Sequence, residues 1–224
     1  MDSPCIKLLR LGRKSYTDAL RIQDQIASKL KSQLESKSKP DNTLIFVEHE
    51  PVYTIGIRTS NYDVKQQQQL EKLGASFVRS DRGGLITFHG PGQLVVYPII
   101  HLHSFQVART VRSYVYQLEQ SIINTCRKFG VETERTADTG VWLKGRDFKI
   151  AAIGIHCSRY VTTHGLALNC DTDLTWFEHI VPCGLAGKGV TSLSRELGAK
   201  VSIGDVEPVY VEAFEQVFRC RVEK

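Results

Sequence analysis

The chain has 224 residues, 42% hydrophobic and 24% charged, values that are ordinary for a globular protein and exclude a disordered or fibrous one. Its longest apolar run, Leu94 to Ile100, is interrupted by Pro98 and is too short to span a membrane. The net charge of +5 is spread along the chain, so no nucleic-acid stripe is indicated, although it favours encounter with an acidic protein partner.

The six cysteines, at positions 5, 126, 157, 170, 183 and 220, include no CxxC pair, and the sequence holds no Asn-x-Ser/Thr acceptor. This pattern favours a reducing compartment over a disulfide-stapled secreted chain. The N-terminus lacks a secretory apolar core and carries four basic residues up to Lys14 against one acidic residue, Asp2. That composition is compatible with a mitochondrial address, with a cytoplasmic location as the alternative.

Hydrophobic periodicity predicts an alternation of strands and single helices. Apolar residues three and four apart indicate long helices over 15–35, with Ser15 as N-cap, and over 111–127. We further expect strands over 6–11, 44–48, 52–57, 77–78, 94–100, 141–143, 148–157 and 161–169, and helices over 63–73, 191–197 (capped by Thr191) and 205–218.

Strands that come in hairpins and helices that come singly are typical of an α+β fold. We therefore expect one domain over 1–224, in which a mixed, mostly antiparallel sheet is flanked by helices, with 1–7 as a short leader or disordered start. The continuous apolar strand at 94–100 implies burial on both faces of that sheet.

A glycine-rich stretch over 82–93, Arg-Gly-Gly-Leu-Ile-Thr-Phe-His-Gly-Pro-Gly-Gln, brackets a short apolar strand. Glycine permits sharp turns and the close approach of another molecule. The stretch is therefore either a surface shaped for a ligand or two ordinary turns around a hairpin strand, and spacing alone leaves both open.

Lys149 lies in an apolar strand, on the same face as Ala151, Ile153 and Ile155, and the opposite face is equally apolar. Either the lysine snorkels from the strand end or it is functional. If it is buried, its ammonium needs an acceptor or an adjacent anion.

Cys183 lies between Pro182 and Gly184, in a glycine-rich turn that a substrate can reach. A buried structural thiol is the alternative interpretation. A thiolate beside an ammonium is a prepared nucleophile, because the positive charge lowers the pKa of the thiol.

Other chemistries have little support in the sequence. The cysteines and histidines form no close ligand pair for zinc. A GxSxG elbow, a Walker loop and a dinucleotide fingerprint are all missing from the sequence.

Four blocks, in order, resemble the lipoyl(octanoyl) transferase family, and its animal mitochondrial members are the most similar. The blocks are Arg82–Gln93 with Tyr97-Pro98, Lys149–Gly154, His164–Asn169 and Pro182–Gly184, and Thr175–His179 adds a fifth. Two positions depart from the family pattern: Phe88 replaces a tyrosine of many relatives, and Asp138 stands where bacterial relatives often have proline.

The resemblance implies the fold of the biotin and lipoate protein ligase catalytic domain. It implies transfer of octanoyl from acyl carrier protein to lysines of lipoyl domains, in 2-oxoacid dehydrogenase complexes and the glycine cleavage H protein, without cofactor, metal, nucleic acid or membrane. Carried over, Cys183 is the acyl-thioester nucleophile and Lys149 its activating partner. The implied substrate-binding residues are Arg82, Gly83, Gly84, Leu85, Ile86, Thr87, Phe88, His89, Ala152, Ile153, Gly154, Gly165, Leu166 and Ala167.

Two other functions are compatible with the same fold. An ATP-dependent lipoate or biotin ligase activates its acid as an adenylate and does not need Cys183. A non-catalytic protein that binds lipoyl domains needs neither Cys183 nor Lys149.

Overall fold

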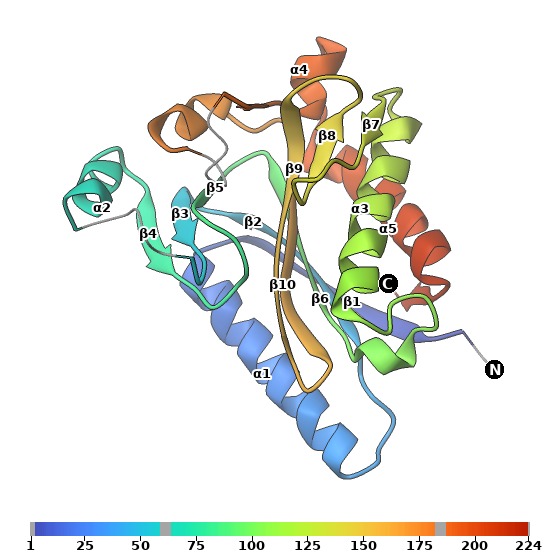
Figure 1. Ribbon diagram of the computed structural model, residues 1–224. Helices are drawn as coiled ribbons and strands as arrows, with labels where there is room; N and C mark the ends of the chain where they lie inside the picture. The colour runs from blue at the N-terminus through green and yellow to red at the C-terminus, as the bar shows by residue number, and fades with distance from the viewer. Residues whose placement is uncertain (1–2, 59–63, 182–186, 224) are drawn as a thin grey trace.

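The computed structural model describes residues 3–58, 64–181 and 187–223. Within these residues nine strands form one mixed sheet (Figure 1). They are β1 (Cys5–Lys14), β2 (Thr43–His49), β6 (Gln93–Ile99), β7 (Thr133–Glu134), β8 (Val141–Leu143), β9 (Phe148–Ser158), β10 (Val161–Asn169), β11 (Gly189–Val190) and β12 (Arg221–Glu223). The spatial order is β12-β1-β2-β6-β10-β9-β8-β7, and β11 pairs with β9. The pairs β1–β2, β1–β12 and β9–β11 are parallel, and the others are antiparallel.

Helices cover both faces of this sheet (Figure 1). Helix α1 (Tyr16–Glu35) packs on one face, and α3 (Val111–Lys128) with α5 (Ile203–Phe218) packs on the other. Strand side chains alternate between these two layers, so Val95 contributes to the α1 core and Val96 to the opposite one. The predicted burial of the 94–100 strand on both faces is confirmed.

A second sheet of three strands carries the glycine-rich stretch. Its order is β4 (Ser76–Arg79), β3 (Val52–Ile55) and β5 (Thr87–His89). Together with α2 (Val64–Glu71) and the 3-10 helix η2 (Leu174–His179) it encloses a core of its own, which includes Tyr53, Phe88 and Phe177. Sequence periodicity predicts these strands but not their separation from the main sheet.

Helix starts follow from single side chains. The Ser15 hydroxyl accepts a hydrogen bond from the Asp18 N–H at 3.2 Å, which confirms the predicted cap of α1. The predicted cap Thr191 is wrong: the hydroxyl of Ser192 caps α4 (Leu193–Leu197), while that of Thr191 donates to Glu196. Helix α5 starts two residues before its predicted start, because Ser202 forms a capping box.

The ends and connections add smaller features. Residues 5–7 pair with β12, at the edge of the main sheet. A 3-10 helix, η1 (Leu102–Ser104), precedes α3. Among the described cysteines, 5, 126, 157, 170 and 220 are free thiols. Across the described ranges, no helix combines the length and the apolar character needed to cross a membrane.

Candidate active site

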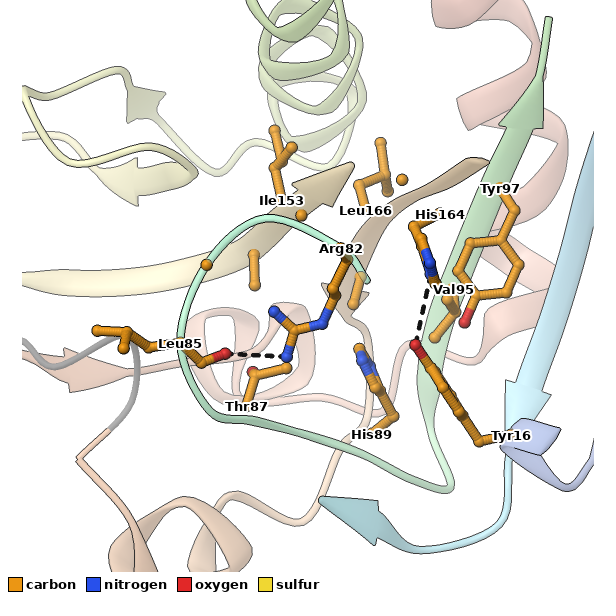
Figure 2. A pocket seen from close by; sticks show the side chains of 15 residues that line it. Tyr16, Arg82, Leu85, Thr87, His89, Val95, Tyr97, Ile153, His164 and Leu166 are labelled. Atoms are coloured by element: carbon orange, nitrogen blue, oxygen red, sulfur yellow. Dashed lines mark hydrogen bonds between the residues drawn. The ribbon is translucent and has the colours of Figure 1, made fainter. Parts of the chain in front are cut away.

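A pocket lies between the main sheet and the loop that begins at Arg82 (Figure 2). We call it the inner pocket. Its walls are Tyr16, Arg82, Gly84, Leu85, Thr87, His89, Val95, Tyr97, Ala152, Ile153, Gly154, His164, Gly165, Leu166 and Ala167. Three segments that are far apart in the sequence, around 82–89, 152–154 and 164–167, thus meet around one cavity.

Most of the substrate-binding residues expected from the resemblance line this pocket, and three do not. Gly83 lines a neighbouring pocket instead. Ile86 and Phe88 are fully buried in the core of the small sheet. Four further lining residues were not among the expected ones: Tyr16, Val95, Tyr97 and His164.

Arg82 organises the loop over the inner pocket. Its Nη2 donates to the Thr54 carbonyl oxygen at 2.6 Å and to the Leu85 carbonyl oxygen at 2.9 Å (Figure 2). The Gly83 N–H donates to the Ile155 carbonyl oxygen at 2.9 Å, which attaches the loop to β9. A Cβ on Gly154 would lie 2.8 Å from the Gly83 carbonyl oxygen, so this close approach requires glycine.

Two buried histidines are fixed as neutral rings. The Nδ1–H of His89 donates to Oε1 of Gln93 at 2.7 Å, and burial holds the pKa of His89 well below its usual range. His49 donates from Nδ1 to the Lys14 carbonyl oxygen at 3.1 Å and accepts at Nε2 from the Tyr97 hydroxyl at 2.7 Å. Burial lowers the pKa of His49 to about 4. These rings therefore hold uncharged polar edges near the pocket at neutral pH.

His164 closes one side of the inner pocket in an unusual backbone conformation, with φ of +56°. Its Nε2 lies 2.8 Å from Oδ1 of Asp81, and its Nδ1 accepts from the Tyr16 hydroxyl at 3.4 Å (Figure 2). Burial lowers the pKa of His164 even though the Asp81 carboxylate opposes that shift. The contact joins the first residue of α1 to β10, and so it ties α1 to the pocket wall.

A second, wider pocket adjoins the first, and we call it the outer pocket. Its walls are Arg58, Gly83, Gly84, Leu85, Val111, Val115, Ala137, Asp138, Thr139, Lys149, Ile153, Gly154 and Ile155. The two pockets share Gly84, Leu85, Ile153 and Gly154, so they meet at that point. Val111, one of the apolar residues whose spacing predicts the 111–127 helix, is 45% exposed and stands at this pocket.

Lys149 is buried at the outer pocket, with 6% of its surface exposed, so the snorkelling interpretation is excluded. Its Nζ donates to the Thr139 carbonyl oxygen at 3.2 Å and lies 4.7 Å from the centroid of the Trp142 ring. Gly140 has φ of +122°, and a Cβ there would lie 2.7 Å from the Ala151 carbonyl oxygen and 3.3 Å from Cε of Lys149. The backbone of β9, and beside it the lysine side chain, therefore requires glycine at this position.

The predicted nucleophile, Cys183, lies outside the described residues, as do its neighbours 182 and 184–186. The described residues on either side of that segment can be placed. Ile180 packs in the core of the small sheet. Val190, in β11, stands opposite Lys149, and the Thr191 N–H donates to the Lys149 carbonyl oxygen at 2.9 Å.

This fold is that of the catalytic domain of lipoate and biotin protein ligases. A bipartite lipoate protein ligase of Thermoplasma acidophilum superposes with a TM-score of 0.72 at 16% identity, covering 100% of this chain and 87% of that one. A biotin protein ligase of Aquifex aeolicus superposes with a TM-score of 0.52 at 10% identity, covering 95% and 69%. The fold expected from the sequence is confirmed.

Sequence comparison narrows the class. The model of the lipoyl protein ligase A/B catalytic domain matches residues 15–215. A relative from Danio rerio, named mitochondrial octanoyl-acyl-carrier-protein:protein N-octanoyltransferase, is 54% identical, over 96% of this chain and 93% of its own. A relative of the same name from Xenopus tropicalis is 51% identical, over 96% and 88%. The chain belongs to the lipoyl protein ligase A/B family and, within it, to the octanoyltransferases.

Proposed function

We propose that this chain transfers an octanoyl group from octanoyl-acyl carrier protein to a lysine of a lipoyl domain, with Cys183 carrying the acyl group between two half-reactions. The observation that carries the proposal is the junction at Ile153 and Gly154, where an inner pocket with apolar walls opens into the outer pocket that holds Lys149. Membership of the octanoyltransferases supports the same reaction.

The walls of the inner pocket suit an acyl chain, and its cavity of about 40 Å³ has to widen when the whole octanoyl chain enters. Val95, Ala152, Leu166 and Ala167 give it aliphatic walls, and its polar rings are neutral. An octanoyl chain has seven carbons beyond its carbonyl, and burial of each CH₂ contributes about 0.8 kcal/mol, so full burial contributes about 5 kcal/mol of preference over short acyl groups. The carbonyl end then lies at the junction, within reach of the outer pocket.

In the first half-reaction the thiolate of Cys183 attacks the thioester carbonyl of the donor. A new carbon–sulfur bond forms, the bond to the pantetheine sulfur breaks, and that thiolate leaves and takes a proton from the Lys149 ammonium, so that Lys149 is neutral for the second half-reaction. One thioester replaces another, so the step is nearly isoenergetic and needs no ATP. Lys149 assists because a positive charge close to the cysteine favours its thiolate form.

In the second half-reaction the ε-amine of the acceptor lysine attacks the acyl group on Cys183. An amide bond forms, the thiolate of Cys183 is released, and the amine loses a proton, which Lys149 takes or relays. The gain in stability from thioester to amide drives the transfer forward. The pairing of Val190 with Lys149 supports this role, because it anchors the chain that follows Cys183 on the Lys149 strand.

The acceptors that we propose are the lipoyl domains of 2-oxoacid dehydrogenase complexes and the glycine cleavage H protein, within the mitochondrion. The basic N-terminal residues and the mitochondrial names of the relatives from Danio rerio and Xenopus tropicalis support this address. A fusion of residues 1–25 to a reporter, assayed for import, tests it.

Trapping the acyl-enzyme tests the reaction itself. Incubation with octanoyl-acyl carrier protein should add the mass of one octanoyl group to the chain, and Cys183→Ser should abolish the adduct. Octanoylation that requires ATP and free octanoate and survives Cys183→Ser would instead support a ligase. No adduct, together with a Lys149→Ala variant that behaves as wild type, would support a protein that only binds lipoyl domains.

A further inference from the structure

We infer that Glu119, paired with Arg135, is a positioning residue that holds Lys149 in place by fixing the segment 138–140. The inference rests on the proposed function of Lys149. Glu119 is 7% exposed and lies in the middle of α3, one turn after Val115 of the outer pocket. No motif in the sequence points to it.

The Lys149 amino group contacts a backbone carbonyl. Its Nζ donates to the Thr139 carbonyl oxygen at 3.2 Å, and Thr139 belongs to a bend that is part of neither a helix nor a strand. Such a segment has no ladder of hydrogen bonds to fix its carbonyls, so other contacts must set the direction of this one.

Glu119 supplies the contact on one side. Its Oε1 accepts from the Gly140 N–H at 3.1 Å, at the residue that follows Thr139. Its Oε2 forms an ion pair with Nε of Arg135 at 3.1 Å. Two contacts hold Arg135 in turn. Its guanidinium carbon lies 3.7 Å from the centroid of the Tyr116 ring, and its Nη2 donates to Oε1 of Gln120 at 2.7 Å.

Trp142 supplies the contact on the other side. Its Nε1 donates to the Asp138 carbonyl oxygen at 2.9 Å, and the Asp138 carboxylate pairs with Lys188 at 2.8 Å. The segment is thus held at Asp138 by the indole and at Gly140 by Glu119. The Thr139 carbonyl lies between these two anchors.

The chemistry of this anchor matches its position. A buried carboxylate is costly unless it is paired, and here one oxygen meets a guanidinium while the other meets the backbone. Burial raises the pKa of Glu119, while the Gly140 N–H and the charges of Arg135 and Lys149 act against that rise. A purely structural anchor would stabilise the fold but would leave the reaction at Lys149 unchanged.

The test separates position from charge with two substitutions. Glu119→Gln keeps the length of the side chain and an oxygen that accepts from Gly140. Glu119→Asp keeps the charge but is one methylene shorter. We measure the rate constant and KM for octanoylation of the enzyme by octanoyl-acyl carrier protein, normalised to the fraction of chains that can be acylated at the end point.

Glu119→Asp should slow acylation by about 10- to 100-fold, with KM within about twofold, because a displacement of about 1 Å at a catalytic group has effects of this size. Glu119→Gln should stay within about threefold of wild type. The matched control is Glu134→Asp: the Glu134 carboxylate also accepts from a glycine N–H, that of Gly145 at 2.8 Å, but in an exposed hairpin turn. Its rate should equal that of wild type.

A Glu119→Asp variant that acylates at the wild-type rate per active chain overturns the inference, even if its melting temperature falls. So does a Glu119→Gln variant as slow as Glu119→Asp, since charge rather than position would then matter. Wild-type protein that forms no adduct would contradict the proposed function instead.

Discussion

The inner and outer pockets meet at one point, yet they are built from different groups. Aliphatic side chains and neutral rings make up most of the inner pocket, together with the Arg82 guanidinium, and its histidines have lowered pKa values because they are buried. Charged side chains such as Arg58, Asp138 and Lys149 line the outer pocket. Under the proposed function this contrast would separate two tasks: the inner pocket would recognise a chain by its apolar length, and the outer pocket would provide the reactive groups.

The strongest test of this division of tasks removes the Lys149 amino group from the outer pocket. Lys149→Ala should slow acylation of the enzyme about 1,000-fold, or about 4 kcal/mol in activation free energy, with little change in donor affinity. Single-turnover kinetics with octanoyl-acyl carrier protein measure it.

The control for this variant is Lys188→Ala. Lys188 contacts the same indole, with Nζ 4.8 Å from its centroid, but it pairs with Asp138 and does not line the outer pocket. In this variant the rate of acylation should fall less than tenfold. Equal losses in the two variants would show that positive charge near Trp142, and not Lys149 itself, is what the reaction needs.

The stability of the protein at acid pH tests whether the buried histidine rings in and near the inner pocket are neutral. A histidine whose pKa is lower in the folded than in the unfolded protein stabilises the fold fully at a pH above its unfolded pKa. This contribution is lost as the pH falls towards its folded pKa. For His49 the decline runs from about 6.5 towards about 4 and amounts to about 3 kcal/mol in the free energy of unfolding. Urea unfolding at pH 7, 5.5 and 4.5 measures the slope.

His49→Gln removes this titration and should flatten the slope in the same window. Carboxylates with lowered pKa values, such as Asp41 at about 2 and Glu48, begin to contribute below about pH 5 and do so equally in the variant and the wild type. A variant and a wild type with identical slopes would show that His49 does not remain neutral on folding.

Filling the inner pocket should change which acyl group is accepted. Ala152→Leu places a larger side chain against the wall, and we expect kcat/KM for an octanoyl donor to fall about 30-fold, or about 2 kcal/mol. The butanoyl donor should be used within about twofold of wild type. Equal losses for both donors would place the acyl chain elsewhere.

The sequence predicts most of what forms locally, and less of what distant segments form together. The caps at Ser15 and the alternation along 94–100 depend on neighbouring residues, and both predictions are confirmed. Cap prediction failed at Thr191 because Ser192, the next residue, can form the same bond. Tyr16 joins the inner pocket only because α1 starts beside β10, a tertiary relation that periodicity does not encode.

The candidate site divides in the same way. From its place in an apolar strand, Lys149 could either snorkel from the strand end or be buried, and the folded structure shows that it is buried. The Thr139 carbonyl that accepts from it could not be predicted, because the direction of that carbonyl depends on Glu119 and Trp142. Strands β3, β4 and β5 were expected, but their pairing across long intervals sets the small sheet apart.

The smallest expected effect concerns Phe88, where many relatives have tyrosine. Its ring is fully buried, stacks on Trp176 with centroids 5.0 Å apart and lines neither pocket. A Cβ on Gly90 would lie 2.5 Å from Cζ of Phe88, so a hydroxyl added at Cζ emerges beside the Gly90 backbone. Phe88→Tyr should therefore cost about 1 kcal/mol in the free energy of unfolding and change kcat/KM less than twofold. Steady-state kinetics measure kcat/KM, and urea unfolding measures the stability. A gain in turnover would show that this hydroxyl reaches the substrate and that the small sheet takes part in recognition.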